Sequence, residues 1–163
     1  MLQGGTARIS VLGWPHSPNR RERMTQHTEP NSGEPLSDDR TNAGPLVLVV
    51  DDEPLVRNVI GRVLQGRGYR TLLASDGQEG LDLFARHGDE IRLLVLDWHL
   101  PGRSGQATLA EFYLRRPGLR VVLVTGDHNA DLDQNAREYV ACLLFKPFTA
   151  RDLMIAVDAV LTA

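Results

Sequence analysis

Short apolar runs alternate with amphipathic segments from residue 46 to residue 161. Five of these runs have the length of a β-strand and end at polar or turn-forming residues: 46–50, 69–74, 91–96, 119–124 and 140–145. Most of their positions are apolar, without the polar alternation of a half-exposed strand. Such runs are typical of strands buried on both faces of a parallel sheet.

Each apolar run is followed by a segment that indicates a helix. The first helix is predicted to begin at Pro54 and to end at Gly66, with one apolar face: Leu55, Val56, Val59, Ile60, Val63 and Leu64. Later helices are predicted after Asp76, Ser104 and Thr149, whose side chains suit a helix N-cap. The segment 129–139 is only weakly amphipathic, and we predict a short helix there.

Strict alternation of strand and helix predicts an α/β fold with a parallel sheet and helices on both faces. We predict a flavodoxin-like, doubly wound (βα)5 domain over residues 46–163, with strand order 2-1-3-4-5. In that order the first and third strands are neighbours, and the carboxyl ends of all strands share one edge of the sheet.

Residues 1–45 have a different texture, rich in Pro, Gly, Ser, Thr, Asn and charge, and without a sustained period. They offer too little apolar surface to offset the loss of chain entropy, so we predict a disordered N-terminal extension. The basic run 20–23 is interpreted as a solvated stretch. Met24 is a plausible start of a shorter product, a hypothesis that N-terminal sequencing would test.

Composition excludes several classes of protein. A net charge of −3 over 163 residues provides no basic field for nucleic acid or an anionic membrane. The single cysteine, Cys142, allows neither an intrachain disulfide nor a site of several thiolates. The apolar runs are too short to span a membrane, and no secretory signal is evident, so we expect a cytoplasmic protein.

Polar residues that can carry chemistry follow four of the five predicted strands. Asp51 and Asp52 follow the first, Asp97 ends the third, Thr125 ends the fourth, and Lys146 ends the fifth. Lys146 is the only lysine among 18 basic residues, so a compact ammonium stands out at this place in a chain that otherwise uses arginine. Independent caps and a surface lysine would require four coincidences at four strand ends.

Clustered carboxylates suit a hard divalent cation, and Mg²⁺ takes one or two carboxylates together with water and phosphate oxygens. The ammonium of Lys146 can grip a phosphoryl group, and the hydroxyl of Thr125 can donate one hydrogen bond to it. A carboxylate can also accept a phosphoryl group as an acyl phosphate, and Asp97, central in the set, is the candidate acceptor.

Residues 46–161 resemble the response-regulator receiver domain of two-component signalling. The matching residues are Asp51-Asp52, Asp97 with Leu100-Pro101-Gly102 and Gly105, Thr125-Gly126, and Lys146-Pro147-Phe148. The stretch 97–101 is similar to that of chemotaxis response regulators. Each motif alone is weak, but together they are specific.

The resemblance implies that Asp97 takes phosphoryl from a phosphohistidine of a sensor histidine kinase or phosphotransfer protein. It implies Mg²⁺ held by Asp51, Asp52, Asp97 and the backbone carbonyl of His99. It also implies that Thr125 and Lys146 contact the phosphoryl oxygens, and that the Lys146–Pro147 bond is cis.

Three positions bear on switching and lifetime. The family usually carries Phe or Tyr three residues before the lysine, where this chain has Leu143, so the usual aromatic partner of the Thr125 switch is replaced. His99 and Asp127 follow the acceptor and the threonine by two residues, positions that in the family flank the hydrolytic water. An inert His99 and a purely structural Leu143 remain the alternatives.

No helix-turn-helix, cyclase or kinase pattern follows residue 161, so we expect a stand-alone receiver that signals by protein contact or onward phosphotransfer. The expected downstream surface is the fourth strand, the helix after it and the fifth strand, in a monomer or a phosphorylation-dependent dimer. We expect no enzyme activity beyond Mg²⁺-dependent self-phosphorylation and autodephosphorylation. The alternatives are an Asp-nucleophile phosphohydrolase and a degenerate receiver that binds partners without phosphorylation.

Overall fold

The computed structural model describes residues 8–12, 44–127, 132 and 134–162. Its centre is a sheet of six strands in the order β1-β6-β5-β4-β2-β3. The strands are β1 (Ile9–Val11), β2 (Leu46–Val50), β3 (Arg70–Ala74), β4 (Ile91–Asp97), β5 (Val121–Thr125) and β6 (Cys142–Phe145). The strands β2 to β6 are parallel. Their order across the sheet, β3-β2-β4-β5-β6, is the predicted order 2-1-3-4-5, because β2 is the first predicted strand.

The sixth strand, β1, corrects the prediction that residues 1–45 are disordered throughout. Ile9–Val11 pairs antiparallel with β6, so part of the predicted tail belongs to the sheet. Three residues are too few to display a period in the sequence. Their pairing depends on an open edge of β6, which lies more than 130 positions further along the chain. The remainder of the predicted tail, 1–7 and 13–43, lies outside the described residues.

Each parallel strand is followed by a helix of the described residues: α1 (Pro54–Gln65), α2 (Gly77–His87), α3 (Gly105–Arg115), α4 (Gln134–Tyr139) and α5 (Ala150–Leu161). The predicted N-caps are confirmed, because the side chains of Asp76, Ser104 and Thr149 each accept a backbone N–H of the first turn. Thr149 and Asp152 form a complete capping box. Of the predicted helix 129–139, the described part is α4.

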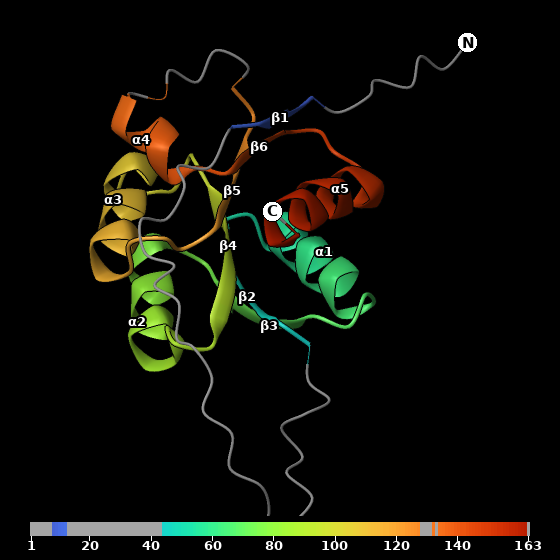
Figure 1. Ribbon diagram of the computed structural model, residues 1–163, viewed down its shortest axis with the longest axis horizontal. Helices are drawn as coiled ribbons and strands as arrows, with labels where there is room; N and C mark the ends of the chain where they lie inside the picture. Colours follow the sequence, from blue (N-terminus) through green and yellow to red (C-terminus); the bar gives the residue numbers. More distant parts are fainter. Residues whose placement is uncertain (1–7, 13–43, 128–131, 133, 163) are drawn as a thin grey trace, which may run out of the picture.

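Helices cover both faces of the sheet, which separates two layers of core (Figure 1). α1 and α5 lie on one face, and α2, α3 and α4 lie on the other. Neighbouring residues of β2 alternate between the two cores: Val47 and Val49 face α1 and α5, while Leu48 and Val50 face α2 and α3. All five residues of β2 are buried, as the continuous apolar run predicted.

The apolar face predicted for α1 is only partly buried. Ile60 and Leu64 are fully buried, but Leu55 is 81% and Val59 is 55% exposed. The six apolar residues spread over a wider arc of the helix than the sheet can cover, so two of them face solvent near the start of the helix. Among the described residues, no helix is long and apolar enough to cross a membrane.

Candidate functional site

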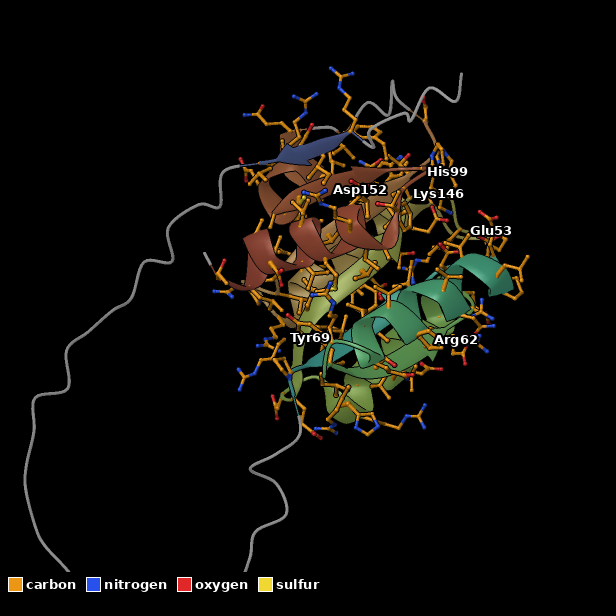
Figure 2. The ribbon with its side chains drawn as sticks, turned by 90° about the vertical axis from the view of Figure 1, so that its right-hand side faces the viewer. Glu53, Arg62, Tyr69, His99, Lys146 and Asp152 are labelled. Atoms are coloured by element: carbon orange, nitrogen blue, oxygen red, sulfur yellow. The ribbon has the colours of Figure 1, made fainter. Side chains whose placement is uncertain are left out.

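The side chains that follow the parallel strands gather at one end of the molecule. Figure 2 shows Glu53, His99 and Lys146 together at this end, with Tyr69 at the opposite end. The strand register explains the gathering: Asp97 pairs with Val124 across β4 and β5, and Thr125 pairs with Phe145 across β5 and β6. The carboxyl ends of the parallel strands therefore form the predicted edge.

Lys146 links the acidic groups of the site. Its Nζ donates hydrogen bonds to Asp97 Oδ2 at 2.7 Å and to Glu53 Oε1 at 2.9 Å. Asp51 Oδ2 lies 3.3 Å from the same nitrogen, an ion-pair contact. Burial would lower the pKa of Lys146, but the hydrogen bonds to Asp97 and Glu53 and the nearby negative charges outweigh it and raise the pKa, so the ammonium stays charged.

Asp51 is a buried carboxyl group whose environment disfavours its charged form. Its side chain is almost fully buried, and burial raises its pKa to about 6, although the backbone N–H of Glu53 and the charge of Lys146 act in the opposite direction. Its Oδ1 accepts that N–H at 2.8 Å. Its Oδ2 meets no donor with hydrogen-bond geometry among the described residues, so beyond the ion pair with Lys146 this buried acceptor has room for a further partner.

The acidic cluster differs from the predicted one in one member. Carboxylate oxygens of Asp51, Glu53 and Asp97 all lie within 4.8 Å of one another, whereas Asp52 is exposed and is not among the three. Asp52 instead lines a neighbouring hollow together with His99. Glu53 reaches the cluster from the N-cap position of α1, a place where an acidic residue is easily interpreted as a helix-end preference. The role of Asp52 as a metal ligand stays a prediction.

These oxygens fit a hard cation. Two buried carboxylates and one exposed carboxylate converge, and the unsatisfied Asp51 Oδ2 is an acceptor that a cation or its bound water would satisfy. The ammonium of Lys146 contacts all three carboxylates and offsets part of their negative charge. A Mg²⁺ ion would bind beside these carboxylates, and the predicted ligand at the His99 carbonyl stays a prediction.

Asp97 is positioned by the loop that follows β4. Its Oδ1 accepts the backbone N–H of His99 at 3.0 Å, and its Oδ2 is held by Lys146, so both oxygens have a fixed direction. The loop folds back on itself at Gly105, where an added Cβ would lie 2.3 Å from the carbonyl oxygen of Trp98. Only glycine allows this close approach, which accounts for Gly105 in the motif.

Thr125 lies between the strands of Asp97 and Lys146 and is fully buried. Its carbonyl accepts the backbone N–H of Lys146 at 2.7 Å, and its hydroxyl accepts the N–H of Asp127 at 3.1 Å. The chain thus ties Lys146 to the end of β5. The Lys146–Pro147 bond is cis, as the resemblance implied.

Leu143, at the position of the usual aromatic residue, packs partly buried against the core on the side of α2, α3 and α4. It pairs with Leu123 on one side and with Ser10 of β1 on the other. The predicted switch residues, Thr125 and Leu143, therefore belong to adjacent strands.

The fold and the site define a class: a flavodoxin-like α/β domain with a lysine and an acidic cluster at the carboxyl edge of its sheet. Residues 47–158 match the response regulator receiver domain, so the chain belongs to this family of two-component signalling. Receiver domains bind Mg²⁺ at an acidic pocket and interact with histidine kinases and phosphotransfer proteins.

Curated relatives agree with this assignment. The chain is 30% identical over 112 residues to sporulation initiation phosphotransferase F of Bacillus subtilis, a match that covers 68% of this chain and 89% of that protein. It is 32% identical over 120 residues to the probable transcriptional regulatory protein TcrX of Mycobacterium tuberculosis, covering 71% of this chain but 49% of that protein. The chain thus spans about half the length of this larger regulator.

Solved structures show the same fold. A response regulator receiver domain protein from Clostridium thermocellum is 31% identical, with a TM-score of 0.65, over 72% of this chain and 94% of that one. The receiver domain of NtrX from Brucella abortus is 31% identical, with a TM-score of 0.64, over 72% of this chain and 98% of that one.

Proposed function

We propose that this receiver domain accepts a phosphoryl group on Asp97 from the phosphohistidine of a sensor histidine kinase or a phosphotransfer protein, with Mg²⁺ as cofactor. The observation that carries the proposal is the position of the Lys146 ammonium, 2.7 Å from the buried Asp97 carboxylate and beside the unsatisfied Asp51 oxygen. A phosphoryl group on Asp97 would bring its negative oxygens to a fixed cation.

In the transfer, a carboxylate oxygen of Asp97 forms a bond to phosphorus while the P–N bond of the donor breaks, and the electron pair stays on the imidazole. The His99 amide fixes the orientation of the Asp97 carboxylate. Lys146 can stay paired with the negative charge as it moves onto the phosphoryl oxygens, because its Nζ already contacts the Asp97 carboxylate that attacks. Mg²⁺ held at the carboxylates of Asp51, Glu53 and Asp97 would neutralise charge on the phosphoryl oxygens. Thr125 is proposed to hydrogen-bond a phosphoryl oxygen, and His99 and Asp127 are proposed to set the rate of hydrolysis.

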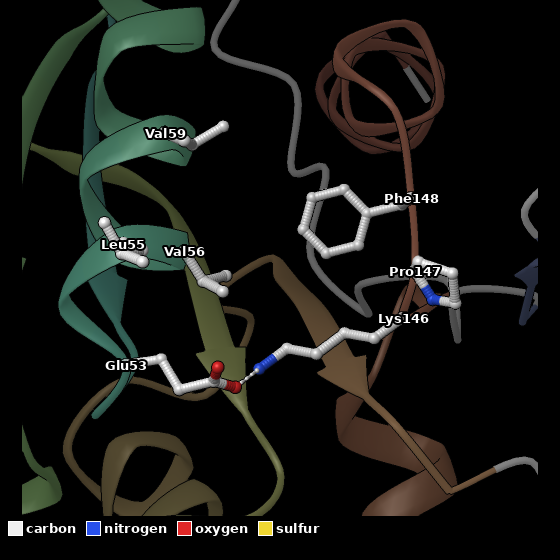
Figure 3. Close-up of a pocket in the computed structure, with 7 residues that line it drawn as sticks. All are labelled: Glu53, Leu55, Val56, Val59, Lys146, Pro147 and Phe148. Carbon is white, nitrogen blue, oxygen red and sulfur yellow. Dashed lines mark hydrogen bonds and ion pairs between the residues drawn. The ribbon is translucent and has the colours of Figure 1, made fainter.

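The donor is proposed to dock on an apolar groove beside the site. The groove has a volume of about 450 Å³ and is lined by Glu53, Leu55, Val56, Val59, Lys146, Pro147 and Phe148. Figure 3 shows the apolar side chains of α1 facing Pro147 and Phe148, with the Glu53–Lys146 ion pair at one end. Since Lys146 belongs to both groove and site, a helix of a phosphohistidine protein seated here would bring its imidazole towards Asp97.

The domain is proposed to act as a single receiver that signals by protein contact or onward phosphotransfer, as a monomer or a phosphorylation-dependent dimer. The proposed output surface is the one expected from the sequence, formed by β5, α4 and β6, and we extend it to α5, which packs beside β6. In favour of a single receiver, the match spans 89% of sporulation initiation phosphotransferase F. We further propose that the chain has no catalytic activity beyond its own phosphorylation and dephosphorylation.

The proposal is tested by incubating the full chain with acetyl phosphate and Mg²⁺ and measuring intact mass. We expect one base-labile phosphoryl group, lost on removal of Mg²⁺ and absent from Asp97→Asn. Asp82→Asn, at an exposed aspartate of α2, is the matched control and should be labelled like the parent chain. A label on histidine or serine, or labelling of Asp97→Asn at the parent rate, would overturn it, and turnover of a phosphomonoester would instead indicate a hydrolase.

The docking groove is tested separately with Leu55→Ser and Val59→Ser. Both side chains are exposed, so the fold should not suffer. We expect transfer from a phosphorylated histidine kinase of the same organism to slow about tenfold, while labelling by acetyl phosphate is unchanged. Equal loss with both donors would place the defect in the site rather than in docking.

A further inference from the structure

The segment 8–12 closes the outer edge of the sheet. It pairs antiparallel with β6, with Ile9 opposite Leu144, Ser10 opposite Leu143, and Val11 opposite Cys142. The amide of Leu12 donates to the carbonyl of Ala141 at 3.0 Å, and the amide of Phe145 donates to the carbonyl of Arg8 at 3.2 Å. In an antiparallel pair the backbone N–H and C=O groups of every second residue point towards the neighbouring strand. Ser10 lies midway between Arg8 and Leu12, so its N–H and C=O also point towards β6.

The segment is held by side chains on both faces of the sheet. Ile9 packs against the core on the side of α1 and α5, and Leu12 packs against the core on the side of α2, α3 and α4. Val11, in contrast, is 63% exposed. In Figure 1, β1 lies along β6 with α4 on one side and α5 on the other. The segment therefore covers the strand at the centre of the proposed output face.

The covered edge is one residue away from the phosphorylation site. Phe145, whose amide is bound by Arg8, directly precedes Lys146 in the chain. Ser10 lies opposite Leu143, the residue that replaces the usual aromatic side chain of the switch. Any rearrangement of β6 that follows Lys146 or Leu143 must also change this pairing, because the hydrogen bonds join the two strands directly.

We propose that residues 8–12 are an intramolecular occupant of the β6 edge and keep the α4–β6–α5 face closed. A partner reaches this edge only when the segment leaves it, and an extended strand with apolar side chains at alternate positions is the chemistry that the vacated edge accepts. The role of this segment in closing the face rests on the proposed function. Whether residues 8–12 occupy the β6 edge is measured without phosphorylation or a partner, so a failure of this proposal can be told apart from a failure of the proposed function.

The test uses the full chain and two proline substitutions in β1. Ser10→Pro removes a backbone group that faces β6 and should detach the segment. Val11→Pro is the matched control, because the amide of residue 11 faces away from β6 and proline is tolerated there on an edge strand. We expect hydrogen exchange at the Phe145 amide to rise about tenfold or more in Ser10→Pro and to change less than about twofold in Val11→Pro.

A second measurement asks whether the vacated edge binds a strand. A fluorescent peptide with the sequence of residues 7–13 should bind Ser10→Pro about tenfold more tightly than the parent chain or Val11→Pro, because the tethered segment competes at a millimolar effective concentration. A peptide with proline at the position of Ser10 should not bind. Equal affinity for the three chains, or unchanged exchange at Phe145 in Ser10→Pro, would overturn the proposal.

Loss of folding is distinguished within the same experiment. Amides of β4, in the centre of the sheet, report global unfolding and should keep their protection in every variant. If Ser10→Pro lowers that protection too, Ile9→Ser replaces it as the probe, since it removes the side-chain anchor without altering the backbone. Full protection of Phe145 in a folded Ile9→Ser chain would then count against the proposal.

Discussion

Asp51→Asn is expected to stabilise the metal-free protein, although it removes a residue of the site. Burial raises the pKa of Asp51 to about 6, against 3.8 for an unperturbed aspartate, so the native state binds this proton more tightly than the unfolded state does. The stability contributed by the protonated group is therefore complete below the unfolded pKa and is lost as pH rises through the folded one. The difference between a pKa of 3.8 in the unfolded chain and about 6 in the folded one corresponds to about 3 kcal/mol of stability.

The neutral amide of asparagine resembles the protonated carboxyl and keeps an oxygen for the Glu53 N–H. We expect urea unfolding with a chelator near neutral pH to show Asp51→Asn more stable by up to about 3 kcal/mol, a gain that shrinks below about 1 kcal/mol near pH 4. Asp52→Asn, at an exposed position, is the control and should change stability by less than about 0.5 kcal/mol.

With Mg²⁺ present the order should reverse, because the parent chain gains binding energy that Asp51→Asn cannot recover. A metal-free Asp51→Asn that is less stable than the parent at neutral pH would refute the reasoning, since it would mean that attraction to Lys146 outweighs the cost of burial.

Further outcomes follow from the same geometry. Trp98 borders the acceptor and lines the hollow that contains Asp52, so its fluorescence should change on titration with Mg²⁺ and stay constant in Asp97→Asn; a constant signal in the parent chain would contradict a nearby metal. Lys146→Arg keeps the charge but not the compact ammonium, and we expect the exchange response of the β6 edge to phosphorylation to fall by about half or more. A full response would argue against the role given to the sole lysine. Gly105→Ala places a Cβ against the Trp98 carbonyl and should lower the free energy of unfolding by about 1–3 kcal/mol in a urea titration.

The sequence predicted the parallel strands well because each is a continuous apolar run that the fold buries on both faces. It also located Asp51, Asp97, Thr125 and Lys146, since strand ends in a doubly wound sheet share one edge. These predictions needed only the local period and one topological rule.

Other features depend on tertiary geometry that a local pattern does not contain. β1 has three residues and exists because β6 leaves an edge free between α4 and α5. Glu53 joins the acidic cluster because its side chain reaches Lys146 from the helix cap, an orientation that the sequence does not specify. Leu55 and Val59 belong to the apolar arc of α1 but lie beyond the part of the helix that the sheet covers. They therefore line a groove instead of the core.

Two of the groups that meet at Lys146, Asp97 and Glu53, lie 49 and 93 residues before it in the chain. No short contiguous peptide contains them all. An unfolded or fragmented chain is therefore expected to lose the proposed reactivity towards acetyl phosphate altogether, instead of retaining a weakened form. The yield of acyl phosphate in a denaturant series should consequently trace the population of native molecules, which makes this chemistry a built-in gauge of conformational integrity.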